Sequence, residues 1–327
     1  MSAKLLEGKV ILITGGTGSF GHRAAQVFTD SGAAKVIIYS RDEYKQSVMR
    51  TVFKDNSILK FAIGDVRDSV RLENAMVGVD YVVHAAAMKQ VPACEENPEE
   101  AVAINVLGSQ NVATAAMKQG VECVVNLSAD KAVYSISVYG ATKFLAEKVF
   151  INSNLQEGSV TRFVNLRYSN VLDSRGGVFE VFRDLLRAGG EARVFGTTMA
   201  RFFLSQQEIA ELCMFAFERC VGGETLVKLA SPIRISELAE TMQRVIGTGS
   251  VRIDDEGIRA GEKLNAVLLA EEEVELAHTY EDLIVINNLR NELSLEGLGS
   301  VDTEQMEMEN RPYTSGADLE LLVRQSL

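Results

Sequence analysis

Histidine and cysteine are scarce in this sequence, with three histidines and four cysteines among its 327 residues. No two cysteines form a C-x-x-C pair, and three histidines leave too few partners for a usual zinc site. The cysteines are Cys94, Cys123, Cys213 and Cys220. We therefore expect no bound metal, and we expect reduced thiols in a cytoplasmic protein.

The sequence also lacks an excess of positive charge and any long apolar run. Its 33 Lys and Arg residues against 45 Asp and Glu give a formal net charge of -12. This charge repels phosphate backbones and anionic lipid, so neither nucleic acid nor a membrane surface is an expected partner. No apolar run approaches the ~18 residues of a transmembrane helix, and residues 1–8 are too short and polar for a signal peptide. We expect a soluble chain.

What the sequence does contain is a regular alternation of two patterns. Six β-branched apolar runs of strand length, which predict buried strands, are separated by longer segments with helical spacing. The predicted strands are residues 10–14, 35–39, 59–64, 81–85, 122–127 and 162–167, and the predicted helices are 22–31, 69–76, 101–119 and 138–151. This order indicates an α/β protein with a doubly wound, Rossmann-like parallel sheet.

Beyond about residue 170 the alternation weakens, and shorter elements follow at 178–188, 206–217 and 235–246. We expect residues 1–170 to form the doubly wound domain. Residues 171–287 are expected to form a smaller α/β substrate-binding lobe over the carboxyl edge of the sheet, interleaved with the first domain. Residues 288–327 are a predicted tail that ends in a helical pattern at 318–324.

The first predicted strand runs directly into a glycine-rich turn of the form G-x-x-G-x-x-G, and a helix is expected to begin near Phe20. Such glycines permit a tight turn and let the backbone approach a pyrophosphate, which the N–H groups at the helix start attract. The alternative is a strand-to-helix turn without a ligand. The position of the glycine turn in the first βαβ unit favours a dinucleotide site over this alternative. The expected contacts are Gly15, Thr17, Gly18, Ser19, Phe20 and Gly21.

The end of the second predicted strand indicates which dinucleotide binds. An NAD enzyme usually has an acidic residue here for the ribose hydroxyls, whereas this chain has Ser40 and Arg41, with Lys45 one turn later. A hydroxyl and two cations suit the 2′-phosphate of NADP, so we predict that residues 1–170 bind NADP. A solvated charge cluster that includes Asp42 is the alternative. Further expected cofactor contacts are Asp65, Val66, Ala85, Ala86 and Ala87.

Tyr139 and Lys143 stand four residues apart in a predicted helix and therefore share one face. An ammonium beside a phenol favours phenolate, which makes Tyr139 a candidate base. The Y-x-x-x-K pattern is common by itself. After the fifth strand of a glycine-turn sheet, however, it resembles the short-chain dehydrogenase/reductase superfamily. The resemblance implies that Tyr139 handles a hydroxyl proton and Lys143 binds the nicotinamide ribose, so that both Tyr139 and Lys143 are expected cofactor contacts.

The segment Leu-Ser-Ala-Asp-Lys-Ala-Val at 127–133 narrows this resemblance. It is similar to the soluble UDP-N-acetylglucosamine 4,6-dehydratases of the extended branch, which invert C5. Supporting motifs lie at 14–21, 39–43, 64–68, 84–89, 174–176 and 257–264. The resemblance implies that Tyr139 takes the O4 proton while hydride passes from C4 to NADP and later returns to C6. Lys131, as a neutral amine, would remove the C5 proton, and Asp130 would protonate the departing 6-hydroxyl.

The same resemblance implies a UDP-hexosamine substrate and a homo-oligomer. Arg201 and Arg259 would hold the diphosphate, since the planar fork of arginine pairs with phosphate oxygens. Lys89 and Asn170 would contact the sugar or its phosphate, and Glu262 a ribose or uracil group. Each of these could instead be an ordinary surface or interdomain residue.

Ala129 departs from the family pattern, which has threonine there to polarise the oxygen at C4. Loss of one positioned donor typically costs about 10²- to 10³-fold in rate, and Ser128 is expected to point to the opposite face of the strand. Other departures are Gln90, Ser169, Asp173, Ala200 and Asn265. Two further hypotheses therefore stay open: a nucleotide-sugar 4-epimerase, and an NADP-binding protein that has lost catalysis.

Overall fold

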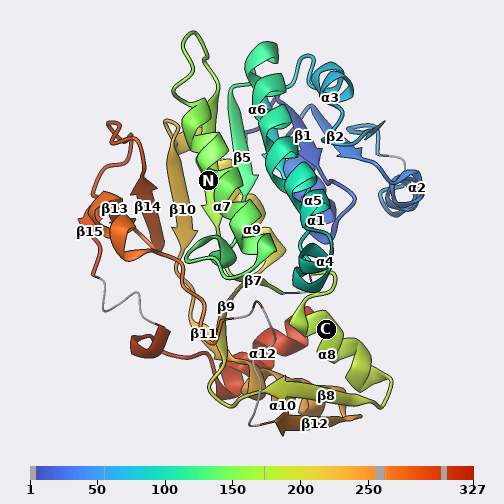
Figure 1. The fold of residues 1–327 in the computed structure, drawn as a ribbon. Coiled ribbons are helices and arrows are strands. Elements are labelled where there is room, and N and C mark those ends of the chain that lie inside the picture. The colour runs from blue at the N-terminus through green and yellow to red at the C-terminus, as the bar shows by residue number, and fades with distance from the viewer. Residues whose placement is uncertain (1–4, 55, 173, 255–260, 262, 303–307) are drawn as a thin grey trace.

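A large, mostly parallel sheet runs through the computed structural model (Figure 1), which describes residues 5–54, 56–172, 174–254, 261, 263–302 and 308–327. Its strands are β1 (Val10–Thr14), β2 (Lys35–Ser40), β3 (Leu59–Ile63), β4 (Tyr81–His84), β5 (Cys123–Leu127), β6 (Arg162–Arg167), β10 (Glu224–Lys228), β13 (Ala277–Tyr280), β14 (Leu283–Asn287) and β15 (Gly299–Ser300). The six strands predicted between residues 10 and 167 all form, within one residue of their predicted bounds.

The strand order in this 10-stranded sheet is β15-β13-β14-β10-β6-β5-β4-β1-β2-β3. Within this order, the seven neighbouring strands β10, β6, β5, β4, β1, β2 and β3 all run parallel. The pairs β10–β14, β14–β13 and β13–β15 are antiparallel. The order reverses between β1 and β4, where an open α/β sheet has its ligand-binding crevice at the carboxyl ends of the strands. The predicted doubly wound sheet is confirmed. One detail was wrong: β3 is only partly buried, because it forms the edge of the sheet.

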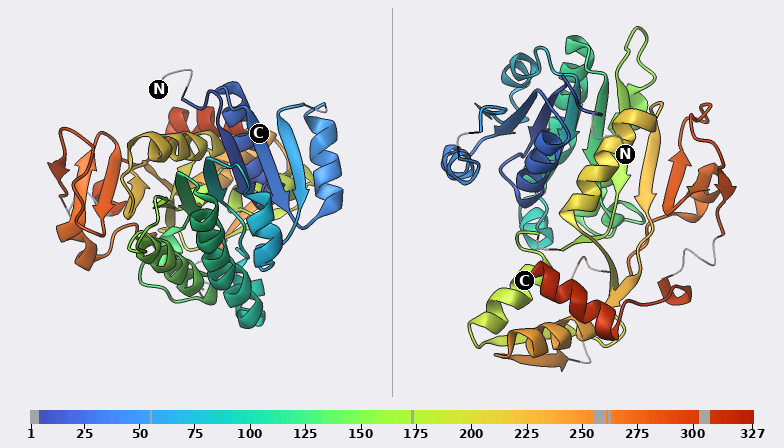
Figure 2. Two further views of the ribbon diagram at one scale, coloured as in Figure 1. Left: turned by 90° about the horizontal axis from the view of Figure 1, so that it is seen from above. Right: turned by 180° about the vertical axis from the view of Figure 1, so that it is seen from behind.

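Helices cover both faces of the sheet (Figure 2). On one face α1 (Ser19–Asp30) packs against α9 (Gln206–Arg219), and on the other α6 (Gly108–Gln119) packs between α3 (Ser69–Ala75) and α7 (Val138–Ser153). The helix predicted at 101–119 is interrupted. It begins as α5 (Pro98–Val102), passes through a π-helical turn at Ala103–Leu107 and continues as α6. Within the turn, buried Asn105 bonds both the N–H and the carbonyl of Met88, at 2.8 and 2.9 Å, which fixes the loop after β4.

A second, smaller core lies below the sheet in Figure 1. It is built from α8 (Val178–Arg187), β8 (Glu191–Phe195), α10 (Ile235–Ile246), β12 (Ser250–Asp254) and α12 (Gly316–Ser326). The helix predicted at 318–324 is α12, which buries Leu319 and Val323 in this core. A small sheet of β7 (Asn170–Val171), β9 (Ala200–Leu204) and β11 (Pro232–Arg234) lies between the two parts.

Some of the segment beyond residue 170 belongs to the large sheet. Strands β10, β13 and β14 lie in that sheet, and α9 packs against α1, although the whole range 171–287 was assigned to the substrate-binding lobe. The division of the chain into domains therefore stays a prediction. Within the described parts of the chain, every helix is too short or too polar to cross a membrane.

A buried histidine joins β1 and β4 where the strand order reverses. The Ser109 hydroxyl donates to the Asn105 carbonyl at 2.6 Å, so it must accept from His84 Nε2, 3.1 Å away. His84 Nδ1 is then left to accept from Thr14 Oγ1 at 2.8 Å. This arrangement needs a neutral ring, and burial accordingly lowers the pKa of His84 to about 3.

His84 is expected to make the protein less stable in acid. The unfolded chain binds a proton on His84 below its ordinary pKa near 6.5, whereas the folded chain does not until about pH 3. The free energy of unfolding should fall by about 1.4 kcal/mol per pH unit as the pH drops below 6.5. Urea unfolding of the protein and of His84→Gln, which cannot be protonated there, measures the difference. Parallel pH profiles would rule out this role for His84.

Candidate functional site

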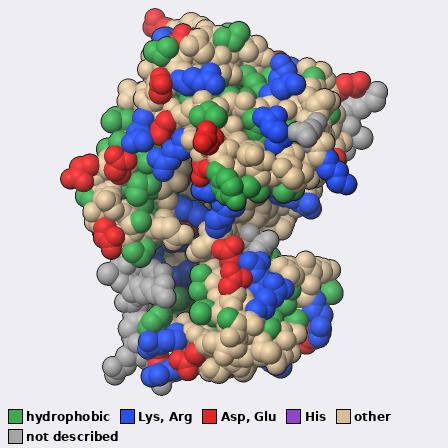
Figure 3. Space-filling view, turned by 90° about the vertical axis from the view of Figure 1, so that its right-hand side faces the viewer, with side chains coloured by type: hydrophobic (Ala, Val, Ile, Leu, Met, Phe, Trp, Pro, Cys, Tyr) green, Lys and Arg blue, Asp and Glu red, His purple; other side chains and the backbone are tan. Residues whose placement is uncertain are grey.

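A cavity of about 620 Å³ lies where the carboxyl ends of β1, β4, β5 and β6 meet. Its walls are formed by the segments that follow these strands, by the start of α1 and by the loop 174–177 that leads into α8. Figure 3 shows the molecule hollowed between its larger and smaller parts, with Lys and Arg side chains beside the hollow. This is the crevice that the topology of the sheet predicts.

The glycine turn forms one wall of this cavity. Gly15 has a φ of +65°, and a Cβ there would lie 2.9 Å from the backbone of Ala86, so only glycine lets these two loops meet. Helix α1 begins at Ser19 after Gly18, which offers no side chain to cap the first N–H groups. These N–H groups are the donors that a dinucleotide's pyrophosphate needs. Among the predicted contacts, Gly15, Gly18, Ser19, Phe20 and Gly21 line the cavity, whereas Thr17 is buried behind it.

The residues predicted to select the 2′-phosphate are already engaged. Buried Ser40 accepts a hydrogen bond from Gln46 Nε2 at 3.0 Å. The Arg41 side chain is 64% exposed, with Nη1 3.7 Å from Asp65 Oδ2. Lys45 lines the cavity and pairs with Asp42 at 2.9 Å. The cations lie together at this end of β2, but each has a carboxylate partner that a phosphate would have to replace.

Asp65 and Val66, also predicted as cofactor contacts, follow β3 and are not among the residues that line the large cavity. The Asp65 carboxylate accepts from Arg67 Nε and Nη2 at 3.0 and 2.8 Å, and these bonds lower its pKa. Val66 is buried under α6, where it touches Gly108. Ala85, Ala86 and Ala87 line the cavity as a wall of small side chains after β4.

Helix α7 carries Tyr139 and Lys143 into the cavity wall, and Ser137 caps the helix by accepting from the Gly140 N–H at 3.2 Å. Lys143 is buried, which lowers its pKa to about 8, and its Nζ donates to the Leu127 carbonyl at 2.5 Å. Burial, and after it the charge of Asp130, raise the pKa of Tyr139. Both effects oppose formation of the phenolate, and the role of Tyr139 as a base stays a prediction.

Asp130 and Lys131 lie in a 3₁₀ turn at Asp130–Ala132, which is separated from the end of β5 by two residues. Lys131 Nζ lies 3.2 Å from Asp130 Oδ1, and the Ser169 hydroxyl donates to Oδ2 at 3.1 Å. The Asp130 side chain is only 5% exposed, while that of Lys131 is 28% exposed. Ser169 is one of the departures from the family pattern, and here it holds the carboxylate in place.

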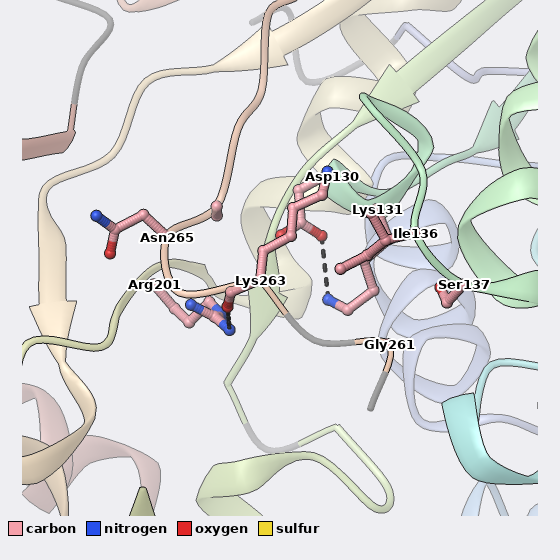
Figure 4. A pocket seen from close by; sticks show the side chains of 9 residues that line it. Asp130, Lys131, Ile136, Ser137, Arg201, Gly261, Lys263 and Asn265 are labelled. Atoms are coloured by element: carbon pink, nitrogen blue, oxygen red, sulfur yellow. Dashed lines mark hydrogen bonds and ion pairs between the residues drawn. The ribbon is translucent and has the colours of Figure 1, made fainter. Parts of the chain in front are cut away.

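Lys131 separates the large cavity from a second, water-sized pocket of about 10 Å³. Figure 4 shows the Asp130–Lys131 pair on one side of this pocket and Arg201 with Lys263 on the other. Arg201 is buried and donates to the carbonyls of Lys263 and Leu264, both at 2.7 Å. Arg201, which was predicted to bind the diphosphate of the substrate, thus holds the backbone of residues 263–264 beside the pocket. Arg259 and Glu262, predicted to bind the nucleotide, lie outside the described residues.

Lys89, Asn170, Ser128 and Ala129 all border the large cavity. Ser128 is buried, and its hydroxyl has no hydrogen-bond partner among the described residues. Ala129 has no hydroxyl to offer at the position where the family has threonine. Of the predicted catalytic residues, Lys131, Tyr139 and Lys143 line this cavity, and Asp130 lines the small pocket that Lys131 also borders.

Two features of the site were not foreseen. The loop residues Ser174, Arg175 and Gly176 line the cavity, although the sequence only marked them as a motif. Buried Arg167 on β6 pairs with Glu147 of α7 and Glu273, each at 2.7 Å. An arginine inside a strand predicted to be buried was the available signal, since such a charge needs buried partners.

A glycine turn at the reversal of the strand order, with a Tyr-x-x-x-Lys helix facing it, defines a nicotinamide-dinucleotide protein of the extended short-chain dehydrogenase/reductase class. The model of the polysaccharide biosynthesis protein family matches residues 11–288. The chain belongs to this family, and the resemblance predicted from the sequence is confirmed.

Curated relatives carry two different activities. An inverting UDP-N-acetylglucosamine 4,6-dehydratase of Campylobacter jejuni is 40% identical over 286 residues, which cover 86% of this chain and 84% of the relative. A UDP-glucose 4-epimerase of Rickettsia canadensis is 41% identical over 279 residues, or 84% of this chain and 81% of the relative.

Solved structures agree with the fold. Pen from Bacillus thuringiensis is 31% identical, with a TM-score of 0.88 and coverage of 98% of this chain and 99% of that one. DesIV of Streptomyces venezuelae, a dTDP-glucose 4,6-dehydratase with NAD bound, is 20% identical with a TM-score of 0.70, covering 96% of each chain. The second likeness shows the fold alone.

Proposed function

We propose that this chain is a nucleotide-sugar 4,6-dehydratase that converts UDP-N-acetylglucosamine to a 4-keto-6-deoxy sugar with inversion at C5. The observation that carries the proposal is Lys131, which lines the same cavity as Tyr139 and Lys143 and pairs with Asp130 in the small pocket beside it. A 4-epimerase needs only the tyrosine and the lysine of α7. A second acid–base pair beside them supports a reaction that also breaks bonds at C5 and C6.

Every step up to the loss of water has a candidate residue in this chain. Tyr139 accepts the O4 proton, and Lys143 orients the dinucleotide at its ribose. Lys131 removes the proton from C5, which the neighbouring C4 ketone makes acidic. Asp130 donates a proton to the oxygen leaving C6, so that water departs, and C5 regains a proton on its opposite face.

The cavity fits a nicotinamide dinucleotide, because Gly15 leaves no side chain between the turn and the β4 loop and the first N–H groups of α1 are uncapped. When bound, the dinucleotide supplies the hydride acceptor for C4 and the hydride donor for C6. We propose NADP as the form used, with Ser40, Arg41 and Lys45 at its 2′-phosphate.

Substrate contacts are proposed for Lys89 and Asn170 in the cavity wall, and for Arg259 and Glu262. Arg201 would either bind the diphosphate of the substrate directly or position the segment at residues 263–264, whose carbonyls it bonds. A homo-oligomeric assembly and a cytoplasmic location are also proposals.

Mass spectrometry of the products in heavy water tests the function. With UDP-N-acetylglucosamine, we expect a product lighter by one water that carries deuterium at C5. A C4 epimer of unchanged mass would instead establish the epimerase. Dinucleotide binding without turnover of any UDP- or GDP-sugar would establish a protein that has lost catalysis.

Arg41→Ala is expected to weaken NADP⁺ binding about tenfold or more and to leave NAD⁺ binding unchanged, since a charge-assisted bond to the 2′-phosphate is lost. Isothermal titration calorimetry with both dinucleotides measures the two dissociation constants. Arg23→Ala, at an exposed position of α1, controls for net charge. Equal affinity of the unaltered protein for NAD⁺ and NADP⁺ would contradict the choice of NADP.

Ala129→Thr is expected to raise the dehydration rate by about tenfold or more, because it supplies a donor for the oxygen at C4. In the control Ala129→Val, valine has nearly the shape of threonine but no hydroxyl, so the dehydration rate should not rise. Initial rates with UDP-N-acetylglucosamine compare the two variants. If they react equally fast, the missing hydroxyl does not limit the reaction.

A further inference from the structure

The loop 174–177 crosses from the smaller part of the molecule to the glycine turn. The backbone N–H of Arg175 donates to Ser19 Oγ at 3.0 Å, which joins this loop to the first turn of α1. Gly176 has a φ of +69°, and its N–H donates to the Glu180 carboxylate of α8 at 2.5 Å. Hydrogen bonds from two adjacent residues of this loop thus join it to α1 and to α8.

Arg175 brings a positive charge to this junction. Its side chain is exposed and lines the large cavity, and among the described residues no carboxylate pairs with its guanidinium. Its charge reaches two neighbours. Burial and then Arg175 lower the pKa of His22 on α1. Desolvation also lowers the pKa of Lys89, with Glu180 opposing the shift and Arg175 adding to it.

Two cations, Lys89 and Arg175, therefore line the cavity together near the uncapped start of α1. Their like charges repel each other, and Glu180 offsets only part of this at Lys89, so a further anion in the cavity would be stabilised beside them. A diphosphate suits the place, because the helix start supplies N–H donors and arginine supplies a planar fork.

We propose that Arg175 binds the diphosphate of the dinucleotide and that the loop 174–177 acts as a clasp, fastening the bound cofactor from the smaller part of the molecule. The inference rests on the proposed function only in that a nicotinamide dinucleotide occupies the cavity. The contact with Ser19 favours the dinucleotide over the diphosphate of the nucleotide sugar, which has the same chemistry. A cofactor that is regenerated in each turnover need not leave, and a clasp would retain it.

Calorimetry on the full chain without sugar nucleotide tests the clasp, with NADP⁺ and NAD⁺ as probes. Arg175→Ala should raise the dissociation constant of the better-bound dinucleotide about 10- to 100-fold, and Arg175→Lys should raise it less. Arg187→Ala removes the same charge from the far end of α8, outside the cavity, and should change nothing. The amount of dinucleotide that remains bound to the purified protein after gel filtration should fall as the dissociation constant rises.

Titration with UDP separates the two sources of diphosphate. Unchanged UDP affinity in Arg175→Ala supports the clasp, whereas weaker UDP binding with unchanged dinucleotide binding would overturn it. Wild-type dinucleotide affinity in Arg175→Ala would overturn it as well, provided that the unliganded variants unfold at the same temperature. If Arg175→Ala binds dinucleotide weakly but the unaltered chain makes no dehydrated sugar, the clasp stands and the dehydratase proposal fails.

Discussion

Lys131→Met is expected to abolish dehydration, with kcat lower by about 10²- to 10⁴-fold, the usual contribution of a general base. Methionine keeps most of the length of the lysine side chain between the two cavities but cannot accept the C5 proton. Deuterium from heavy water should then no longer enter C5, and no product lighter by one water should form. Both quantities can be read from one mass spectrum of the sugar nucleotide.

The Lys131 variant also separates the two activities that the relatives carry. An epimerase does not touch C5, so Lys131→Met would still form a C4 epimer if the chain were one. Lys148→Met is the matched control, because Lys148 lies on α7 over the ring of Phe144 and does not line the cavity. Unchanged deuterium uptake in Lys131→Met would remove the lysine from the mechanism.

Tyr139→Phe is expected to stop the reaction earlier, with a loss of similar size, about 10²- to 10⁴-fold. Only the phenolic oxygen is removed, so the ring still fills its place on α7. Without a base for the O4 proton, the C4 ketone does not form, and C5 does not become acidic. Dehydration, deuterium uptake at C5 and any C4 epimerisation should therefore be lost together.

Dinucleotide affinity distinguishes this effect from damage to the fold. Tyr139→Phe should bind the dinucleotide nearly as tightly as the unaltered protein, because it loses one hydroxyl contact while the glycine turn and Lys143 are untouched. A variant that keeps its affinity and its full rate would show that another group takes the O4 proton. Ser128 would be the first residue to examine, since its hydroxyl is buried at the cavity wall without a described partner.

The sheet and the glycine turn could be predicted because their signals are local. A strand such as β1 is visible as five consecutive apolar or β-branched residues, and Gly15 follows it within one residue. Burial of the edge strand β3 was overestimated, since apolar runs do not reveal how many neighbours a strand has. The π-helical turn before α6 was also missed, because it depends on the contact between Asn105 and Met88 in a distant loop.

The candidate site could be predicted only as a set of residues. That Tyr139, Asp130 and Lys131 meet follows from strands that end at one edge of the sheet. The orientation of Arg201 does not follow, because two of its three carbonyl partners lie more than sixty positions away. The contact between Arg175 and Ser19 spans 156 positions and has no local signal either.

The place of β10 in the large sheet limits how this protein can be divided or recombined. β10 pairs with β6 in parallel, and its partner β14 comes from still later in the chain. A fragment that ended near residue 170 would leave the backbone of β6 as an open edge, where another chain could add. The proposed cofactor-binding and substrate-binding parts are therefore not expected to be exchangeable between relatives as separate units. We expect specificity in this architecture to change through single side chains and loops instead.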